Sequence, residues 1–306
     1  MGEAVEVWRG SVATWECDSM GHLNVSFYMA KAMEALIGLG AHLGMPHAFA
    51  PHAEATLIVR EQHICFLREA QAGARLHIDA GVLEMGEDEA WVLFQMRHHD
   101  GELGASFRMR VAHATSREGR PFPWPDWALV RARAMTIEAP EKAQPRSVSL
   151  APVEVAASLP RALELGLKRI GLGGVQTVDC DAFGRLRTEL VVTRIASSLT
   201  HLLGGLLRDR PAGQGPEPGA VILEYHLIYL DWPRAGGRYE LRSGLTGADP
   251  KLRRMIHWFL DPESGRPWAC AEAIATLFDL ETRSTVTLTE RELAAWSELS
   301  IPGLTL

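Results

Sequence analysis

Long hydrophobic runs, clustered basic residues and closely spaced cysteines are all missing from this chain of 306 residues. No stretch approaches the roughly 18 consecutive apolar residues that a bilayer-spanning helix needs. The first ten residues include Glu3 and Glu6 and no apolar core segment, so we expect no secretory signal there. The formal net charge is -7, whereas nucleic-acid phosphates bind clustered positive charge. We therefore expect neither a membrane nor a nucleic-acid partner.

Cysteine is scarce, with 4 residues and no CxxC pair. Four cysteines in a chain this long do not indicate a disulfide framework, and structural zinc sites usually take closely spaced ligand pairs. We expect a reducing, cytoplasmic setting and neither a metal nor a redox cofactor. Hydrophobic residues make up 47% and charged residues 23%, which is typical of a folded protein.

The chain contains an internal duplication. Residues 10–24 read GSVATWECDSMGHLN, and residues 173–187 read GGVQTVDCDAFGRLR. Cys17-Asp18 aligns with Cys180-Asp181 at an offset of 163 residues (181 minus 18). The same offset pairs further residues without a gap: Glu61 with Glu224, His63 with His226, Gly73 with Gly236, and Gly81 with Gly244. A constant offset over such a distance indicates one unit written twice.

Each copy shows the same order of predicted elements. In the first copy a strand is followed by an apolar helix, which Asn24 or Ser26 can cap, and by four more strands. The predicted elements of the first copy are strand Val5–Trp15, helix Ser26–Leu39, and strands Ala55–Leu67, Arg75–Met85, Ala90–His98 and Gly104–Thr115. Those of the second copy are strand Val175–Asp179, helix Ile195–Leu207, loop Pro211–Gly219, and strands Ala220–Leu230, Arg238–Leu245, Leu252–Leu260 and Trp268–Asp279.

A segment rich in proline and alanine, Pro121–Ser158, separates the copies and includes a predicted short helix, Asp126–Ala134. We expect a first unit over residues 1–139, a linker with a short helix over 140–170, and a second unit over 171–306. A long helix with about five strands, taken twice, predicts an α+β fold.

The segment Asp18-Ser19-Met20-Gly21-His22-Leu23-Asn24, followed by Tyr28, resembles the D-x-x-G-H-x-N…Y signature of hot-dog-fold acyl-CoA thioesterases, the hydroxybenzoyl-CoA thioesterase-like family. This resemblance implies two tandem hot-dog units, each a long central helix wrapped by an antiparallel sheet, with active sites at the seam between paired units. It also implies hydrolysis of an acyl thioester, with coenzyme A entering only as part of the substrate.

The residue types suit that reaction. Asp18 can take a proton from water or attack the carbonyl directly, and the N-terminal amides of the following helix can stabilise the oxyanion. His22 or Asn24 could orient Asp18, the water or the substrate. We expect Tyr28 and Gly21 to contribute to substrate binding. The helix of the second copy could add Ser197, Ser198, Thr200 or His201 across the seam.

Other interpretations stay open at this point. Asp18 could serve only as a turn residue, because D-x-x-G is a common turn pattern. Asn24 could only cap the helix, and Tyr28 could pack in the core. A hot-dog hydratase or dehydratase, pairing Asp18 with His22, and a non-catalytic acyl-CoA-binding protein are the two alternative functions. The acyl group, the choice between coenzyme A and acyl carrier protein, and further pairing into a homo-oligomer are not determined by the sequence.

The two copies differ at the motif. The second copy keeps Asp181 and Gly184 but replaces the histidine and asparagine by Arg185 and Arg187, and the tyrosine by Val191. An arginine beside Asp181 would hold it as an ion pair and make it a weaker base. We therefore expect one working site per chain, centred on Asp18, with the second copy as the structural half of a fused pseudo-dimer.

Overall fold

The computed structural model describes residues 2–18, 20–208, 219–279, 282 and 284–306, without the side chains of 204–208. It divides into two compact units, which are treated separately below. Unit 1 comprises Met1–Arg146 and Cys180–Glu189, and unit 2 comprises Ser147–Asp179 and Leu190–Leu306. No helix among the described residues is both long and apolar enough to span a membrane.

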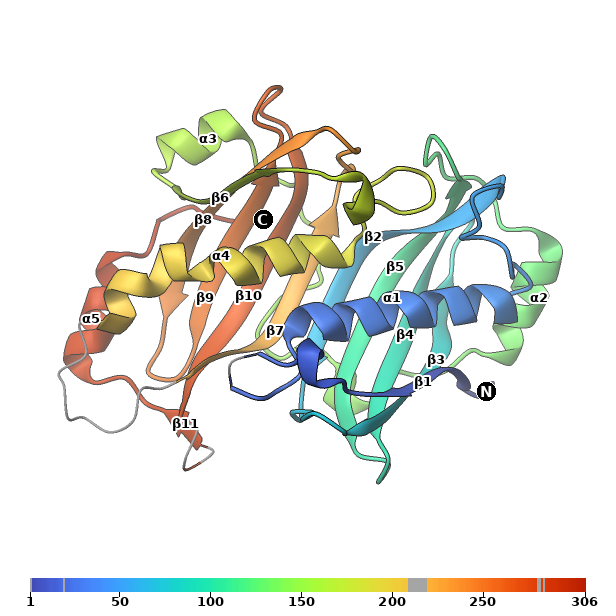
Figure 1. Cartoon of the computed structure of the whole chain (residues 1–306), viewed down its shortest axis with the longest axis horizontal. Helices are drawn as coiled ribbons and strands as arrows, with labels where there is room; N and C mark the ends of the chain where they lie inside the picture. Colours follow the sequence, from blue (N-terminus) through green and yellow to red (C-terminus); the bar gives the residue numbers. More distant parts are fainter. Residues whose placement is uncertain (1, 19, 209–218, 280–281, 283) are drawn as a thin grey trace. The chain divides into compact units, whose positions relative to one another are not determined.

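Unit 1 is a five-stranded antiparallel sheet crossed by one long helix, α1 (Figure 1). The strand order is β1-β3-β4-β5-β2. Its elements are β1 (Val5–Ser11), the 3-10 turn η1 (Thr14–Glu16), α1 (Val25–His42), β2 (Ala55–Phe66), β3 (Arg75–Met85), β4 (Glu89–His98), β5 (Leu103–Thr115), α2 (Asp126–Ala134) and η2 (Glu141–Ala143).

Unit 2 follows the same plan, with strand order β7-β10-β9-β8-β6 and the short β11 paired to β10. Helix α4 crosses its sheet as α1 crosses that of unit 1 (Figure 1). Its elements are α3 (Leu159–Glu164), β6 (Lys168–Gly174), η3 (Thr177–Asp179), α4 (Glu189–Arg208, whose first residue belongs to unit 1), β7 (Gly219–Tyr229), β8 (Arg238–Ala248), β9 (Arg253–Leu260), β10 (Pro267–Asp279), β11 (Ser284–Val286) and α5 (Glu290–Glu298).

Helix α1 is buried because apolar residues cover most of its surface. Met29, Ala32 and Leu36 have no exposed surface, which is the packing expected of a helix that is apolar on nearly every side. Asn24 caps it, as predicted, by accepting a hydrogen bond from the Ser26 N–H at 3.0 Å.

The two units match residue by residue, which confirms the duplication. Elements β1, η1 and β3 have the bounds of β6, η3 and β8 shifted by 163 residues. Elements β5 and α2 have the bounds of β10 and α5 shifted by 164 residues. The offset therefore changes by one between β9 and β10, which places a single inserted residue near that turn.

The predictions for the two strands that precede the motif, one in each copy, are wrong. The strand expected over Val5–Trp15 ends at Ser11, and the strand expected over Val175–Asp179 is not formed, because β6 lies earlier in the chain. The cause is the same in both copies. The acidic side chain that closes each 3-10 turn accepts the backbone N–H three residues before it: Glu16 from Ala13 at 2.8 Å, and Asp179 from Gln176 at 3.0 Å.

The bounds of other predicted elements agree more closely with the structure. The strand Arg75–Met85 and the helix Asp126–Ala134 have the predicted bounds, and α4 begins well before the predicted Ile195. Helix α3 lies in the linker over 140–170, where a short helix was expected, and helix α5 was not predicted. Residues 211–218 of the predicted loop Pro211–Gly219 lie outside the described residues, and Gly219 begins β7. None of the four cysteines is in a disulfide, as predicted.

Candidate functional site

Asp18 shapes the turn in which it lies. Its Oδ1 accepts the backbone N–H of Met20 at 2.8 Å and that of His22 at 3.2 Å. Its own N–H donates to the carbonyl of His22, and Gly21 adopts a φ of 80°, a left-handed conformation that glycine takes without strain. We name this turn, Cys17, Asp18 and residues 20–24, the Asp18 loop. Asp18 therefore has the turn role that the sequence left open, and this role occupies only one carboxylate oxygen.

The second oxygen of Asp18, Oδ2, accepts no hydrogen bond from any described residue. Asp18 itself is half-buried. A carboxylate held by two backbone donors, with its other oxygen unengaged, is oriented and still able to accept a proton.

The N-terminus of α1 has one backbone donor left. The Ser26 N–H is taken by Asn24 Oδ1, and the N–H groups of Phe27 and Tyr28 donate to the Asn24 carbonyl. Among the described residues nothing accepts from the Val25 N–H or from the Asn24 side-chain NH₂. A negative charge that develops next to these two donors would be stabilised at this helix end.

Tyr28 ties α1 to the segment that follows β2. Its hydroxyl accepts the Ala70 N–H at 3.1 Å and lies 3.4 Å from the Arg68 carbonyl. It is 5% exposed and packs edge-on against Phe66. Burial raises the pKa of Tyr28, and the nearby carboxylates of Glu69 and Asp18 raise it further. Tyr28 is thus a neutral anchor in the core, and its role in substrate binding stays a prediction.

Glu69 joins the site and was not predicted from the sequence. It lies between the two residues that Tyr28 holds, and its Oε2 is 3.4 Å from Nε2 of the buried His22. The Leu23 N–H donates to the Ala70 carbonyl, which fixes the Asp18 loop beside this segment. The only available sequence signal was a difference between copies, because the position equivalent to Glu69 is Trp232.

A buried ion pair fixes the η1 turn to α1. Lys31 is 5% exposed, and its Nζ lies 2.6 Å from Oε1 of Glu16. The carbonyl of Glu16 in turn accepts the Asn24 N–H. The second copy repeats this pair with other residues, since Arg194 lies 3.0 Å from Asp179. The pair therefore belongs to the shared backbone plan, in which it positions the start of the helix.

The Asp181 loop, residues 180–187, has the same backbone as the Asp18 loop. Asp181 Oδ1 accepts the N–H groups of Phe183 at 2.8 Å and Arg185 at 3.0 Å, and Gly184 has a φ of 77°. The difference lies at Oδ2 of Asp181, which accepts a hydrogen bond from Nε of Arg185 at 3.0 Å. The predicted ion pair between Asp181 and an arginine is thus confirmed, with Arg185 as the partner.

The start of α4 also differs from that of α1. Glu189 stands where α1 has Ser26, and its carboxylate interacts with its own backbone N–H. Burial raises the pKa of Glu189, an effect that Arg187, 3.6 Å away, partly offsets. A carboxylate already occupying a helix N-terminus competes there with any substrate oxyanion.

The remaining predicted residues lie elsewhere. Thr200 and His201 are exposed on α4 in unit 2, and their contribution stays a prediction. Cys17 is half-buried, and its thiol lies 3.6 Å from the Ala13 carbonyl.

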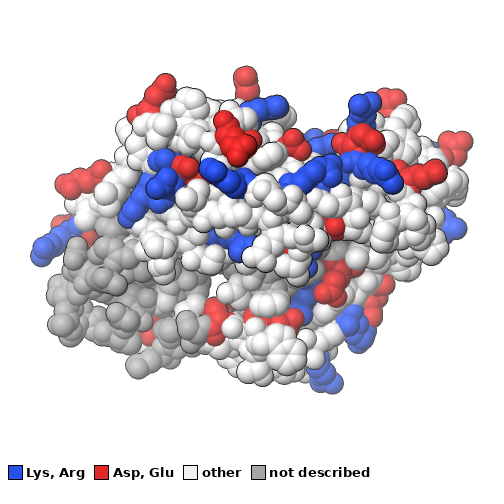
Figure 2. Space-filling view, turned by 45° about the horizontal axis from the view of Figure 1, so that its top comes forward, with Lys and Arg blue, Asp and Glu red and all other residues white. Residues whose placement is uncertain are grey.

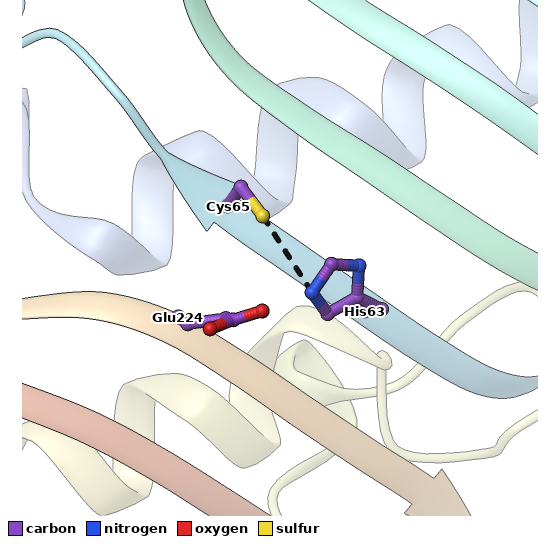
Figure 3. A group of neighbouring side chains, drawn as sticks. All are labelled: His63, Cys65 and Glu224. Atoms are coloured by element: carbon purple, nitrogen blue, oxygen red, sulfur yellow. Dashed lines mark hydrogen bonds between the residues drawn. The ribbon is translucent and has the colours of Figure 1, made fainter. Parts of the chain in front are cut away.

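Figure 3 shows another thiol beside an imidazole: Cys65 Sγ lies 3.5 Å from His63 Nε2 on β2, and both residues are buried. Cys65 also approaches the Gln144 carbonyl at 3.7 Å. Glu224, drawn in the same figure, belongs to unit 2, where it accepts the Ser147 N–H at 2.9 Å. His63, Cys65 and Glu224 are all buried side chains of strands.

Comparison with solved structures identifies relatives of the same fold. A protein from Lactobacillus plantarum assigned as an oleoyl thioesterase is 12% identical, with a TM-score of 0.67 over 89% of this chain and 96% of its own. The 12:0-ACP thioesterase from Umbellularia californica is 11% identical, with a TM-score of 0.68 over 90% and 94%. An acyl-ACP thioesterase from Bacteroides thetaiotaomicron is 11% identical, with a TM-score of 0.62 over 88% and 96%. At these identities the likeness shows the shared hot-dog fold.

No curated protein sequence matches the chain. A family model does, and it matches twice. The model of the thioesterase-like superfamily aligns with residues 12–132 and again with residues 175–297, which follows the duplication. This match covers most of the chain and supports thioester hydrolysis as its chemistry. The chain therefore belongs to the thioesterase-like superfamily.

Proposed function

We propose that this protein hydrolyses acyl-CoA thioesters to the free acid and coenzyme A, with Asp18 as the catalytic residue. The observation that carries the proposal is the unengaged Oδ2 of Asp18, set against the equivalent oxygen of Asp181, which Arg185 occupies. Both carboxylates are oriented by the turn, but only that of Asp18 is available, because that of Asp181 is paired with Arg185.

As a general base, Asp18 takes a proton from a water molecule while the water oxygen bonds to the thioester carbon. The tetrahedral intermediate then expels the thiolate, whose conjugate acid has a pKa of about 8.5, so departure needs little acid assistance. As a nucleophile, Asp18 would instead form a mixed anhydride that water cleaves in a second step. Both routes consume one water and release one acid and one thiol.

The oxyanion would be stabilised by the Val25 N–H and the Asn24 side-chain NH₂, the two donors at the start of α1 without a described acceptor. Removing one such donor typically lowers kcat by about 100-fold or more. Gly21 supports this arrangement by allowing the tight turn that brings the loop onto the helix N-terminus.

His22 and Glu69 act on the loop as positioning residues in this proposal. The buried imidazole of His22, itself part of the Asp18 loop, contacts Glu69. The Tyr28 hydroxyl contacts the backbone of the two residues that flank Glu69 and so holds it in place. Such a network limits the motion of the turn that carries the catalytic carboxylate.

Coenzyme A is the favoured carrier because the formal net charge of -7 disfavours docking of an acidic carrier protein. On the face drawn in Figure 2, acidic side chains lie among the basic ones. Two of the structural relatives are named acyl-ACP thioesterases, so the carrier protein is the competing substrate.

The test is thiol release from a panel of acyl-CoA and acyl-ACP thioesters that varies in chain length, aromatic character and charge. The expected result is hydrolysis of at least one acyl-CoA, with the matching acyl-ACP cleaved more slowly. Water addition to an enoyl-CoA without thiol release would identify a hydratase and contradict the proposal. Binding of acyl-CoA with neither reaction would identify a non-catalytic binder.

A further inference from the structure

Unit 2 contains a buried serine–histidine pair under helix α4. Ser243 on β8 and His257 on β9 are paired across the sheet, and their exposures are 0% and 1%. Ser243 Oγ lies 2.7 Å from Nδ1 of His257. The flanking residues Ile256 and Trp258 belong to the apolar cluster on the opposite face of the sheet, so His257 points to the other side.

Helix α4 covers the side to which His257 points. Arg194 of α4 lies 5.8 Å from the ring of Tyr239, and Tyr239 stacks on Phe259 at 4.7 Å. Because side chains two residues apart on a strand share a face, Phe259 and His257 lie on the same face, beneath α4.

Two of the buried polar atoms on this face that lack a hydrogen-bond partner among the described residues belong to His257 and Tyr225. Nε2 of His257 and the hydroxyl of Tyr225 are buried without a hydrogen bond to any described residue. Tyr225 is paired with Ala273 on β10, and His257 with Ala271 on the same strand. Side chains of paired residues share a face, and no side chain of β10 longer than a methyl group stands between the two polar groups.

Both atoms are hydrogen-bond donors. Burial lowers the pKa of His257 to about 3, so the imidazole is neutral and only one of its nitrogens carries a proton. If Ser243 donates to Nδ1, its hydroxyl proton is used and Nε2 carries the ring proton. The opposite arrangement would leave the buried serine proton unpaired as well. The missing partner is therefore an acceptor, and it is uncharged, because the side chains paired beside the two donors, Ala271, Ala273, Leu227 and Met255, carry no charge that would offset a buried negative charge.

Unit 1 has no such pair. The equivalents of Ser243 and His257 are Ala80 and Phe94, which pair in the same register and are fully buried. Phe107 stands where unit 2 has Ala271, so the same row of unit 1 is filled by two aromatic rings.

Helix α4 is also less completely covered than α1. Leu199 and Leu202 on α4 are partly exposed, whereas their equivalents Leu36 and Leu39 are fully buried. Unit 2 thus combines accessible apolar surface along its helix with two unpaired buried donors beneath it.

We propose that the helix-covered face of unit 2 binds an aliphatic acyl chain bearing an uncharged acceptor oxygen, a hydroxyl or a ketone, which accepts from His257 and Tyr225. The inference deepens the proposed function, on which it rests for the acyl nature of the ligand. It assigns the substrate class: oxygenated rather than plain aliphatic acyl groups.

Calorimetric titration of the full chain with decanoic acid and with its positional monohydroxy and monoketo isomers tests the proposal. Free acids contain no thioester, so the result does not depend on whether the chain hydrolyses one. At least one oxygenated isomer is expected to bind about tenfold more tightly than decanoic acid, the gain expected when a buried donor finds its acceptor.

His257→Phe and Ser243→Ala install the residues of unit 1 and make matched variants. The first removes the donor, and the second frees the imidazole to adopt either tautomer. His257→Phe is expected to abolish the preference and Ser243→Ala to weaken it, and both should leave decanoic acid binding within about twofold, a change smaller than one hydrogen bond would produce. His99→Phe, at an exposed turn in unit 1, is the control that keeps the preference.

Imidazole nitrogen NMR gives a second measurement that needs no variant. The Nε2–H tautomer of His257 is expected in the free protein, and its proton should shift when the preferred isomer is added but not with decanoic acid. The proposal is overturned if no oxygenated isomer is preferred, if His257→Phe keeps the preference, or if the Nε2 resonance is unmoved by a preferred isomer.

Discussion

The Asp18 and Asp181 loops have the same backbone and different chemical surroundings. In both, an aspartate Oδ1 accepts two backbone N–H groups, and a glycine with positive φ completes the turn. In the Asp18 loop, the other oxygen accepts no hydrogen bond from a described residue; in the Asp181 loop, an arginine occupies it. The comparison distinguishes residues that form the turn from residues that could take part in a reaction. The aspartate and glycine form the turn in both copies, so their presence alone does not indicate a reaction.

The helix beginnings differ in the same sense. Asn24 caps α1 and leaves the Val25 N–H without an acceptor among the described residues, whereas Glu189 carries a carboxylate into the first turn of α4. The second copy keeps the hydrogen bonds that the aspartate and glycine make within the turn, whereas the groups that we propose to receive the substrate differ. One half of a fused pair can lose its site while its fold remains.

Transplanting the arginine should give the largest effect. His22→Arg places at the Asp18 loop the residue that pairs with Asp181, so the new guanidinium should bind Oδ2 of Asp18 and block it. We expect kcat/KM for the best acyl thioester to fall by about 100-fold, comparable to the loss of one major transition-state contact.

Two further variants are controls for His22→Arg. His22→Gln removes the imidazole without adding a charge and should cost about tenfold, as expected for a positioning residue. Arg185→His in the second copy should leave the rate unchanged. A His22→Arg enzyme as active as His22→Gln would show that pairing the carboxylate does not matter.

The buried His257 predicts a difference in acid stability between the units. Its pKa is lowered to about 3 in the folded state from an ordinary value of 6.5. Below pH 6.5 the unfolded chain therefore binds a proton that the folded chain does not, and the stability falls as the pH drops toward 3. The slope is about 1.4 kcal/mol per pH unit, or about 2 kcal/mol between pH 6.5 and 5.

His257→Phe, which restores the residue of unit 1, should remove that loss. Urea unfolding at pH 7 and pH 5 measures it: the drop in unfolding free energy should be smaller in the variant by about 2 kcal/mol. Equal drops in the two proteins would mean that His257 is protonated in the folded state.

The smallest expected effect concerns Glu189. Because burial raises its pKa, the ionised carboxylate is disfavoured in the folded state, and its contribution to stability is greatest at low pH and is lost as the pH rises through the folded pKa. Glu189→Gln should therefore raise the unfolding free energy at pH 7 and have no effect below pH 4. Ser26→Gln, at the equivalent position of α1, should show no such pH dependence.

Local patterns predicted much of the fold. The duplication, the helix over Asp126–Ala134 and the strand Arg75–Met85 follow from residue periodicity and a constant offset. Helix α5 carries its own signal, a Thr289–Glu292 capping box, and lies at the position equivalent to α2, yet it was not predicted. The η1 turn was taken as strand because its stability comes from one side-chain contact, Glu16 with Ala13.

The site was predictable only where its residues are close in sequence. Asp18, Gly21 and Asn24 lie on one turn, so a short motif indicates them. Glu69 reaches His22 through tertiary contacts made by Tyr28 and Leu23, which no local pattern encodes. The unpaired donors under α4 likewise became visible only once strand register placed His257 and Tyr225 on one face.

Thioester hydrolysis by Asp18→Asn and Asp181→Asn, measured separately, tests the central claim most directly. Asparagine keeps the oxygen that shapes each turn and removes only the ability to take a proton or attack, so both variants should fold. The account predicts that Asp18→Asn lowers kcat by about 100-fold or more, as loss of a catalytic base does, while Asp181→Asn retains the wild-type rate. Loss of activity in Asp181→Asn with Asp18→Asn still active would contradict it.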